Sequence, residues 1–408
     1  MSDDTTPSPG SSSGVPDGSD PTAPPATAAV AGTDGSPAGG SSAAASSTSG
    51  SSAAGSSAGA RPKGAVRRHW VLVSLAVVLL LLVGSAGGYL YWVHHKLSDI
   101  ARVHVSTIEE NALTPVGATP EKTRALNILL LGADNGADEQ SVEADLKDGK
   151  WTPFVHRSDT LMIAHVSADR KSVQLVSIPR DTWVPIDGYP YSNGYGKINA
   201  AFAFGGPDLA TKSVQQLTGI PIDHLAVIDW AGFKDLTSAL DGIRVYIPQT
   251  FYDESQRITW EKGWHTFKGQ EALAYVRTRY GLADGDFGRI ERQQNFLRAT
   301  MSKLLSKTHN LVSVTNVIKV ITKYLTIDNT WDNGEIIDLA LSLRNIKEAD
   351  VKFLTAPLGR YGMVDGQSIV RLATKQSKLL FDDVKSDDIG DYLQKYPKAG
   401  LSGTRSVS

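Results

Sequence analysis

An apolar segment without a single charged residue, from Trp70 to Val93, constrains this chain more than any other feature. About 20 apolar residues are enough for a helix to span a bilayer. The segment is too long and begins too late to be a cleaved signal peptide. A basic cluster precedes it at residues 61–69, and the positive-inside rule places that side in the cytoplasm. We therefore expect a single-pass protein of the cell membrane whose larger, C-terminal part is extracytoplasmic.

The chain divides around this segment into parts of different composition. Residues 1–60 consist mostly of Ser, Gly, Ala, Pro and Thr, with no Lys or Arg, so they cannot bury enough apolar surface to fold, and we expect a disordered tail. Residues 94–121 are interpreted as a short stalk. Residues 122–385 have the composition of a folded domain, and residues 386–408 are interpreted as a C-terminal tail.

Composition excludes several kinds of function. The chain has no cysteine, which removes disulfides, thiol nucleophiles and cysteine-bound metals. Its net charge of −2 argues against a nucleic-acid partner. The sequence contains neither the HExxH zinc motif nor the GxSxG motif of serine hydrolases.

The folded part alternates strand-like and helix-like segments. Short apolar runs predict strands at residues 126–132, 161–166, 172–178, 223–228, 243–247 and 351–355. Helical periodicity predicts helices at residues 208–217, 230–240, 293–305, 312–324, 333–343 and 367–381. Residues 136–151 and 185–196 are expected to be loops, and residues 251–264 irregular. This alternation predicts a layered α/β domain with a mixed central sheet flanked by helices.

Two aspartates stand at the ends of neighbouring predicted strands. Asp134 follows the first strand and Asp159 precedes the second. If those strands are adjacent and run in opposite directions, the two carboxylates can meet. Two carboxylates together with phosphate oxygens are a usual way for a protein to hold Mg²⁺, with Mn²⁺ as the alternative.

The stretch from residue 269 to residue 298 concentrates arginines. Arg277 and Arg279 are two residues apart, so both side chains leave from one face if the chain is extended there. Asp286 is a candidate N-cap for a helix that begins near Gly288. A helix N-terminus with guanidinium groups beside it suits phosphate.

The residues that follow on this predicted helix have two interpretations. Arg289, Arg292 and Gln293 are spaced at i, i+3 and i+4, so they share one face. That face either binds phosphate or is a solvated basic surface in which Arg292 pairs with neighbouring Glu residues.

Further cations accompany the aspartates along the chain. They are Arg157, Arg180 and Lys197, in addition to Arg277, Arg279 and Arg289. A metal held by two carboxylates would bridge two phosphates, and guanidinium groups would neutralise the charge that spreads in the transition state. The sequence therefore predicts a pyrophosphate site.

Six segments, in a fixed order, resemble the LytR-CpsA-Psr family. They are NILLLGAD at 127–134, RSDTLMIAHV at 157–166, SIPRDTWVPI at 177–186, KINAAFAFGG at 197–206, EALAYVRTR at 271–279 and GDFGRIERQ at 285–293. The resemblance covers about residues 121–385. The composition of the N-terminal tail looks like that of actinobacterial members.

The resemblance implies a phosphotransferase that moves a glycopolymer from a polyprenyl-pyrophosphate lipid to peptidoglycan, forming a phosphodiester and releasing polyprenyl phosphate. It also implies roles for the residues in matching positions. Asp134 and Asp159 would bind Mg²⁺ with the pyrophosphate. The phosphates would be bound by Arg180, Arg277, Arg279 and Arg289, assisted by Gln293, and Arg157 and Lys197 lie in matching motifs.

Several points stay open at the level of sequence. Asp181 and Asp286 either orient the arginines, or one of them is the base that deprotonates the attacking sugar hydroxyl. Members of the family often have an arginine where this chain has Gly136, so its first loop differs. The alternative functions are a membrane-anchored regulator that binds polyprenyl pyrophosphates and a pyrophosphatase that uses water as the acceptor.

Overall fold

The computed structural model describes residues 80–113 except 82, 124–134, 142–147, 151–278, 285–307, 311–401 and 403. The chain separates into compact units at residues 1–68 and 69–408, and every described residue belongs to the second. The predicted tail, the basic segment and residues 70–79 of the predicted transmembrane helix lie outside the described residues. Residues 80–97 are helical on either side of residue 82. Within the described residues, no helix combines the length and apolarity needed to cross a membrane.

A mixed seven-stranded sheet is the centre of the described fold. Its strand order is β1-β12-β7-β2-β3-β4-β13. The strands are β1 (Ala101–Val103), β2 (Leu126–Asp134), β3 (Arg157–Val166), β4 (Val173–Ile178), β7 (His224–Asp229), β12 (Leu325–Asp328) and β13 (Val351–Thr355). β2 pairs in parallel with β7 and antiparallel with β3, and β4 pairs antiparallel with β3 and in parallel with β13. The predicted mixed α/β sheet is confirmed.

This pairing brings several strand ends to one edge of the sheet. The carboxyl ends of β2, β4, β7 and β13 and the amino end of β3 all lie there. In open α/β sheets, ligands bind outside the carboxyl ends of the strands, where loops replace the ladder and polar side chains gather. We therefore expect a ligand-binding site at this edge of the sheet.

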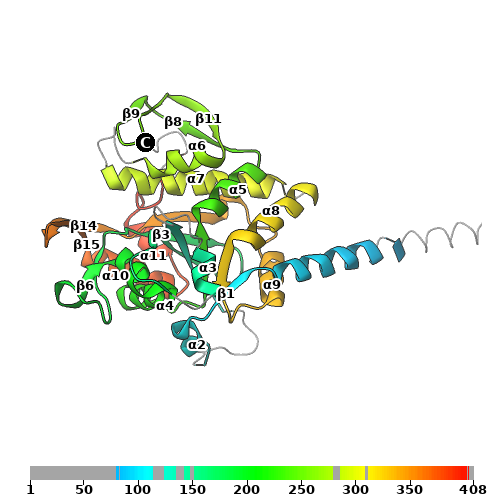
Figure 1. Cartoon of the computed structure of the whole chain (residues 1–408), viewed down its shortest axis with the longest axis horizontal. Coiled ribbons are helices and arrows are strands. Elements are labelled where there is room, and N and C mark those ends of the chain that lie inside the picture. Colours follow the sequence, from blue (N-terminus) through cyan, green and yellow to red (C-terminus); the bar gives the residue numbers. More distant parts are fainter. Residues whose placement is uncertain are drawn as a thin grey trace, which may run out of the picture. The chain divides into compact units, whose positions relative to one another are not determined.

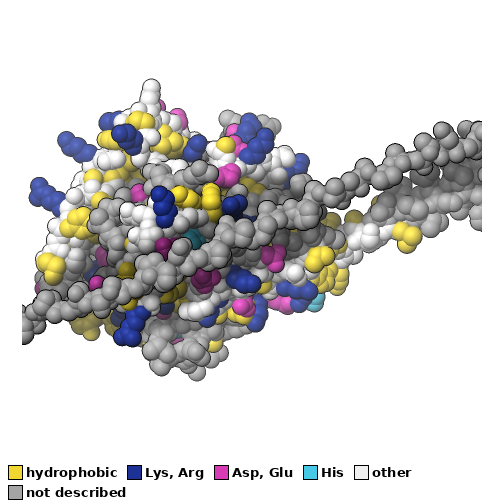
Figure 2. Space-filling view, turned by 90° about the horizontal axis from the view of Figure 1, so that it is seen from above, with side chains coloured by type: hydrophobic (Ala, Val, Ile, Leu, Met, Phe, Trp, Pro, Cys, Tyr) yellow, Lys and Arg dark blue, Asp and Glu magenta, His cyan; other side chains and the backbone are white. Residues whose placement is uncertain are grey.

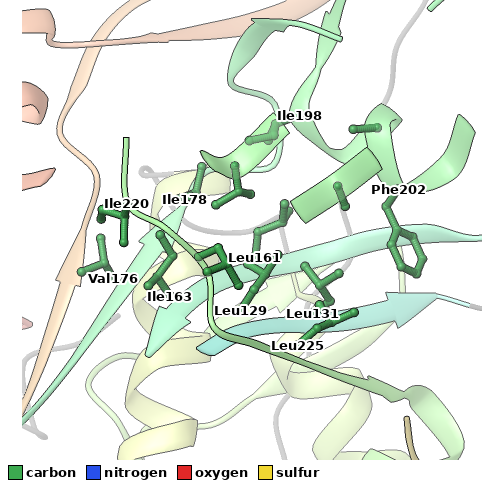
Figure 3. Close-up of a cluster of buried hydrophobic side chains, with 14 of the residues drawn as sticks. Leu129, Leu131, Leu161, Ile163, Val176, Ile178, Ile198, Phe202, Ile220 and Leu225 are labelled. Atoms are coloured by element: carbon green, nitrogen blue, oxygen red, sulfur yellow. The ribbon is translucent and has the colours of Figure 1, made fainter. Parts of the chain in front are cut away.

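Helices cover both faces of the sheet. On one face, α4 (Ile198–Thr218), α10 (Thr374–Lys385) and α11 (Gly390–Lys395) pack on β2, β3 and β4. Figure 3 shows Leu129, Leu131 and Leu161 pointing from the sheet toward Ile198 and Phe202 of α4. On the other face, side chains of α7 (Gly285–Lys307) and α9 (Asn333–Ser342) pack on a second cluster of strand residues. Burial on both faces explains why the strands are almost continuously apolar.

A group of shorter elements packs against α7, and residues 243–267 among them lie beyond that helix, away from the sheet (Figure 1). It consists of α5 (Trp230–Ala239), β8 (Ile243–Ile247), β9 (Phe251–Asp253), β10 (Ile258–Trp260), β11 (Gly263–Phe267), α6 (Gly269–Arg277) and α8 (Leu311–Tyr324). These elements share their own apolar cluster with Phe296 of α7. α7 thus joins this group to the sheet, because Phe296 packs in this cluster and Leu297 and Met301 pack on the strands.

Side chains of both charges are interspersed on the face of the molecule drawn in Figure 2, in keeping with the near-neutral net charge.

Several expectations from the sequence differ from the structure. Residues 251–264, expected to be irregular, form β9, β10 and the start of β11. Within the predicted loop of residues 136–151, residues 142–147 form the short helix α3 (Val142–Lys147). The predicted stalk contributes β1 to the sheet and the helix α2 (Ser106–Leu113). The predicted C-terminal tail contributes α11, whose Tyr392 is buried. These short elements have too few residues for a clear periodicity, and tertiary packing forms them.

The predicted helix of residues 367–381 begins seven residues later than expected. β14 (Leu358–Val364) and β15 (Gln367–Leu372) form a hairpin, and α10 follows it. The turn is Asp365-Gly366, and both residues have positive φ angles of 49° and 74°. Two-residue hairpin turns of this type need positive φ at both positions, which Asp-Gly supplies. The signal was present in the sequence and was missed.

Asp328, at the end of β12, is expected to make the stability of the fold depend on pH in acid. Its buried carboxylate accepts a hydrogen bond from the Leu225 main-chain nitrogen at 2.9 Å and lies 3.3 Å from Nδ1 of His224. Burial raises the pKa of Asp328, but the contacts with His224, Thr330 and Leu225 lower it more, so the pKa is below its ordinary value. The stabilisation is complete above the unfolded pKa of about 3.9 and is lost as pH falls through the lower folded value. We expect urea unfolding of Asp328→Asn to depend less on pH below about pH 4 than that of the unchanged chain; equal pH dependence would contradict this.

Candidate active site

The two aspartates predicted to meet lie on adjacent antiparallel strands. Asp134 is the last residue of β2, and Asp159 is the third residue of β3. Gly132 lies opposite Thr160 and Ala133 opposite Ser158, so Asp159 is an extra residue in the ladder, a β-bulge. Bulges redirect a side chain next to the ladder and are common beside active sites. The expected antiparallel pairing of these two strands is confirmed, and it places both aspartates at one edge of the sheet.

Each aspartate has an arginine beside it. The guanidinium of Arg180 contacts the carboxylate of Asp159, and both side chains are largely buried. Nη2 of Arg277 lies 3.6 Å from Oδ2 of Asp134. The same guanidinium stands 5.3 Å from the centre of the Trp230 ring, a cation–π distance that holds it over the strand end. Positive charge is therefore in place at this edge beside both carboxylates.

Acidic and basic side chains alternate in a chain of ion pairs that continues into the segment after β4. Oδ2 of Asp181 lies 3.7 Å from Nε of Arg180, and Oδ1 of Asp181 lies 3.1 Å from Nζ of Lys197. Main-chain bonds fix this row, since the Asn199 nitrogen donates to the Arg180 carbonyl at 3.2 Å. Asp159, Arg180, Asp181 and Lys197 thus form one connected network, in which Asp181 holds two cations in position.

The helix α7 brings further arginines, and they are buried. Arg289 has 2% of its surface exposed and Arg292 none, so the alternative of a solvated basic face is wrong. Nη2 of Arg292 donates to the Thr278 carbonyl at 2.7 Å. α7 begins at Gly285, so Asp286 lies inside the first turn and its assignment as N-cap is wrong. The stretch before Arg277 is helical rather than extended, because α6 continues to that residue.

Gln293 of α7 forms hydrogen bonds to both α6 and β3. Its Nε2 donates to the Val276 carbonyl at 3.3 Å, next to Arg277. Its Oε1 accepts from Oγ1 of Thr160 at 3.5 Å, next to Asp159. Thr160 was not predicted as a site residue, although its place between Asp159 and an apolar strand was visible. Gln293 therefore holds α7, the end of α6 and β3 together.

The remaining predicted residues are not joined to this network. Arg157 is exposed and lies opposite Asp134 in the β2–β3 register. Arg279, the side chain of Asp286 and Gly136 lie outside the described residues. Among the described residues, no group of three His, Asp or Glu side chains could hold a metal ion by itself.

The LytR_cpsA_psr family matches residues 90–386, which includes every residue of the network. The chain belongs to this family. The resemblance first suggested by six short segments is thereby confirmed over most of the chain.

The chain is similar to a named transferase and to solved structures. The chain is 34% identical over 252 residues to the polyisoprenyl-teichoic acid--peptidoglycan teichoic acid transferase TagU of Enterococcus faecalis, covering 62% of this chain and 75% of the relative. The crystal structure of B. subtilis TagV matches with a TM-score of 0.53 and 26% identity over 65% of this chain and 98% of that one. The structure of TagT bound to LIIa-WTA matches with a TM-score of 0.50 and 26% identity, over 65% of this chain and 91% of that one.

Proposed function

We propose that this chain is a phosphotransferase that moves a glycopolymer from a polyprenyl-pyrophosphate lipid to peptidoglycan. The observation that carries the proposal is the network of Asp159, Arg180, Asp181 and Lys197, with Arg277 beside Asp134, at the carboxyl ends of the strands. Family membership and the names of relatives such as TagU support the same activity.

In the proposed reaction, a hydroxyl oxygen of peptidoglycan attacks the phosphorus that carries the glycopolymer. A new P–O bond forms the phosphodiester, the bond to the bridging oxygen breaks, and polyprenyl phosphate leaves. The hydroxyl proton passes to a basic group. Negative charge grows on the bridging and outer oxygens, and Arg180, Arg277 and Arg289 are the cations that stabilise it. Asp181 acts as a positioning residue, because it holds Arg180 and Lys197 at the site.

Asp134 and Asp159 would hold a divalent cation, Mg²⁺ or Mn²⁺. Both are carboxylates at the same strand edge, and two hard oxygen ligands leave room for phosphate oxygens and water, as Mg²⁺ sites usually do. When bound, the metal would neutralise charge on the pyrophosphate. Without substrate, Arg277 and Arg180 balance the two carboxylates.

The proposed activity predicts a specific product. We expect the full chain, incubated with a synthetic polyprenyl-pyrophosphoryl sugar, peptidoglycan fragments and Mg²⁺, to form a sugar-phosphate-glycan adduct detectable by mass spectrometry. A chelator should reduce the adduct by about tenfold or more, as expected where a metal stabilises charge. Release of sugar phosphate and polyprenyl phosphate without adduct would instead support a pyrophosphatase, and tight lipid binding without any product would support a binding protein.

We also propose that residues 70–93 anchor the chain in the membrane with the N-terminus in the cytoplasm. The support is the uncharged apolar segment and the basic cluster before it. We expect the full chain to sediment with membranes and to resist extraction by high salt. Protease added to the outside of spheroplasts should degrade the C-terminal domain and spare an N-terminal tag. Protection of the C-terminal domain would contradict this orientation.

A further inference from the structure

A pocket of about 530 Å³ lies next to the charged network and has no part in the chemistry described above. Its walls come from four separate elements: β5 (Trp183–Pro185), the end of β15, the first turns of α10 and the end of α4. Pockets of this size are typical of sites for small molecules or for a short stretch of a polymer.

The pocket is directly continuous in sequence with the phosphate network. Thr182 and Trp183, which line it, follow Arg180 and Asp181. The Val370 nitrogen of β15 donates to the Asp181 carbonyl at 2.9 Å, which fixes the hairpin β14–β15 against this segment. Across the β5–β6 pair, in which β6 is Tyr195–Lys197, Trp183 lies opposite Lys197, the residue that holds Asp181. A ligand in the pocket would therefore lie beside the residues proposed to bind phosphate.

Trp183 gives the pocket an aromatic wall held in a defined orientation. Its ring stacks on Tyr195, with ring centres 6.5 Å apart and 19° between the planes. Residues directly opposite each other or two apart on paired strands point to the same face, so Trp183, Tyr195 and Lys197 share one face of the hairpin. An aromatic ring offers a flat surface for the apolar C–H face of a pyranose, while the sugar hydroxyls stay available for hydrogen bonds.

Hydroxyl groups line another part of the pocket. Thr182 and Ser377 are both more than nine-tenths buried. Each donates its proton to a main-chain carbonyl, Thr182 to Pro179 at 2.6 Å and Ser377 to Pro357 at 3.4 Å. A hydroxyl has one donor and two acceptor positions, so each of these oxygens keeps acceptor positions after donating its proton. A ligand rich in hydroxyl groups can supply the donors.

Two cations stand at the pocket, Arg371 and Lys378. Nζ of Lys378 pairs with Asp382, also a lining residue, at 2.5 Å. Arg371 is exposed and makes no ion pair with any residue that the structure describes. The charges at the pocket therefore sum to about one positive charge, which favours a ligand with an anionic group.

We propose that this pocket binds a negatively charged saccharide chain and holds it beside the phosphate network. The proposal rests on the proposed function, because that reaction joins two saccharide-containing molecules at one phosphorus. Leu217, Leu372 and Phe381 also line the pocket, so apolar surface lies beside the hydroxyl groups and the charge of Arg371, a mixture that suits the C–H faces, hydroxyls and anionic groups of a saccharide. The anionic saccharide is either the acceptor glycan of peptidoglycan or the glycopolymer of the donor, and both offer the same chemistry.

Binding of lipid-free ligands tests the pocket separately from catalysis. Isothermal titration calorimetry on the full chain would use two probes, a soluble glycan fragment of peptidoglycan and a saccharide phosphate fragment of the donor polymer. We expect one of them to bind, and Trp183→Ala and Arg371→Glu each to weaken that binding by about tenfold, as for loss of a stacking or charge contact. Arg360→Glu is the matched control, because it makes the same change of charge and Arg360 lies opposite Arg371 in the same hairpin but does not line the pocket.

The outcomes separate this proposal from the proposed function. If one probe binds, and Arg371→Glu weakens that binding while Arg360→Glu does not, the pocket is supported and the probe identifies the source of its ligand, even if no transfer occurs. Transfer activity in a chain that binds neither probe at millimolar concentration overturns the pocket and leaves the function intact. Equal affinity of Arg371→Glu, Trp183→Ala and the unchanged chain also overturns it. Circular dichroism checks that Trp183→Ala is folded. If Trp183→Ala is unfolded, Arg371→Glu still tests the pocket, because Arg371 is at an exposed position.

Discussion

Replacing Arg180 with alanine is expected to lower the rate of transfer by about 10²–10³-fold, the loss typical when one preorganised donor to developing charge is removed. Arg180 contacts Asp159 and lies 3.7 Å from Asp181, so it is the centre of the charged network. The variant loses the guanidinium proposed to bind phosphate and leaves Asp159 without this partner. An extra negative charge would then face the pyrophosphate, and both effects act against the transition state.

Two further variants distinguish this role from a general loss of charge. Arg180→Lys keeps the positive charge but not the two-pronged donor geometry, so we expect only partial recovery of kcat. Arg360→Ala removes an exposed arginine outside the site and should keep the full rate. Rates are measured as adduct formed per minute, together with Tm for each variant. A full rate in Arg180→Ala, with adduct still formed, would rule out the assigned role of Arg180.

The carboxylate side of the site could be predicted because it depends on local pattern. Asp134 and Asp159 directly follow and precede apolar runs, and strands joined by one loop are commonly neighbours. The bulge that directs Asp159 could not be predicted, since it depends on the register between Gly132 and Thr160 rather than on either strand alone. The contact between Asp181 and Lys197 could not be predicted either, because it depends on the pairing of β5 with β6.

The sequence predicted which arginines share a face of α7 but not that this face is buried. The spacing of Arg289, Arg292 and Gln293 correctly placed them on one helix face. Sequence periodicity gives no information on what covers that face, and charged residues are almost never fully buried without partners. Here α6 and the elements around it cover α7, so a face rich in arginine is buried. Because arginines are rarely buried, the charge pattern alone favours an exposed face, and the observed burial therefore carries information that the sequence does not.

Replacing Arg292 with alanine is expected to destabilise the fold by about 3 kcal/mol, because a large, fully buried side chain and its hydrogen bond are both lost. Arg292 has no exposed surface, and Nη2 donates to the Thr278 carbonyl at 2.7 Å, one residue past the end of α6. Its guanidinium also lies 6.0 Å from the centre of the Phe251 ring. Burial raises the pKa of Tyr275 to about 12, and the positive charge of Arg292 opposes that rise, so the two groups interact within this core.

The loss of Arg292 should also lower transfer, although we assign it no contact with substrate. It fixes Thr278, and the residue before Thr278 is Arg277, the partner of Asp134. Differential scanning calorimetry should show Tm lower by about 6–12 °C for a domain of this size. Lys303→Ala, a half-buried cation on the same helix, serves as the control and should change Tm by no more than about 2 °C. Arg292→Met keeps most of the volume and should recover part of the stability but little of the rate, because Thr278 still lacks its donor. If Arg292→Ala kept the Tm of the unchanged chain, Arg292 would have no structural role, and the position of Arg277 would depend on its contacts with Trp230 and Asp134 instead.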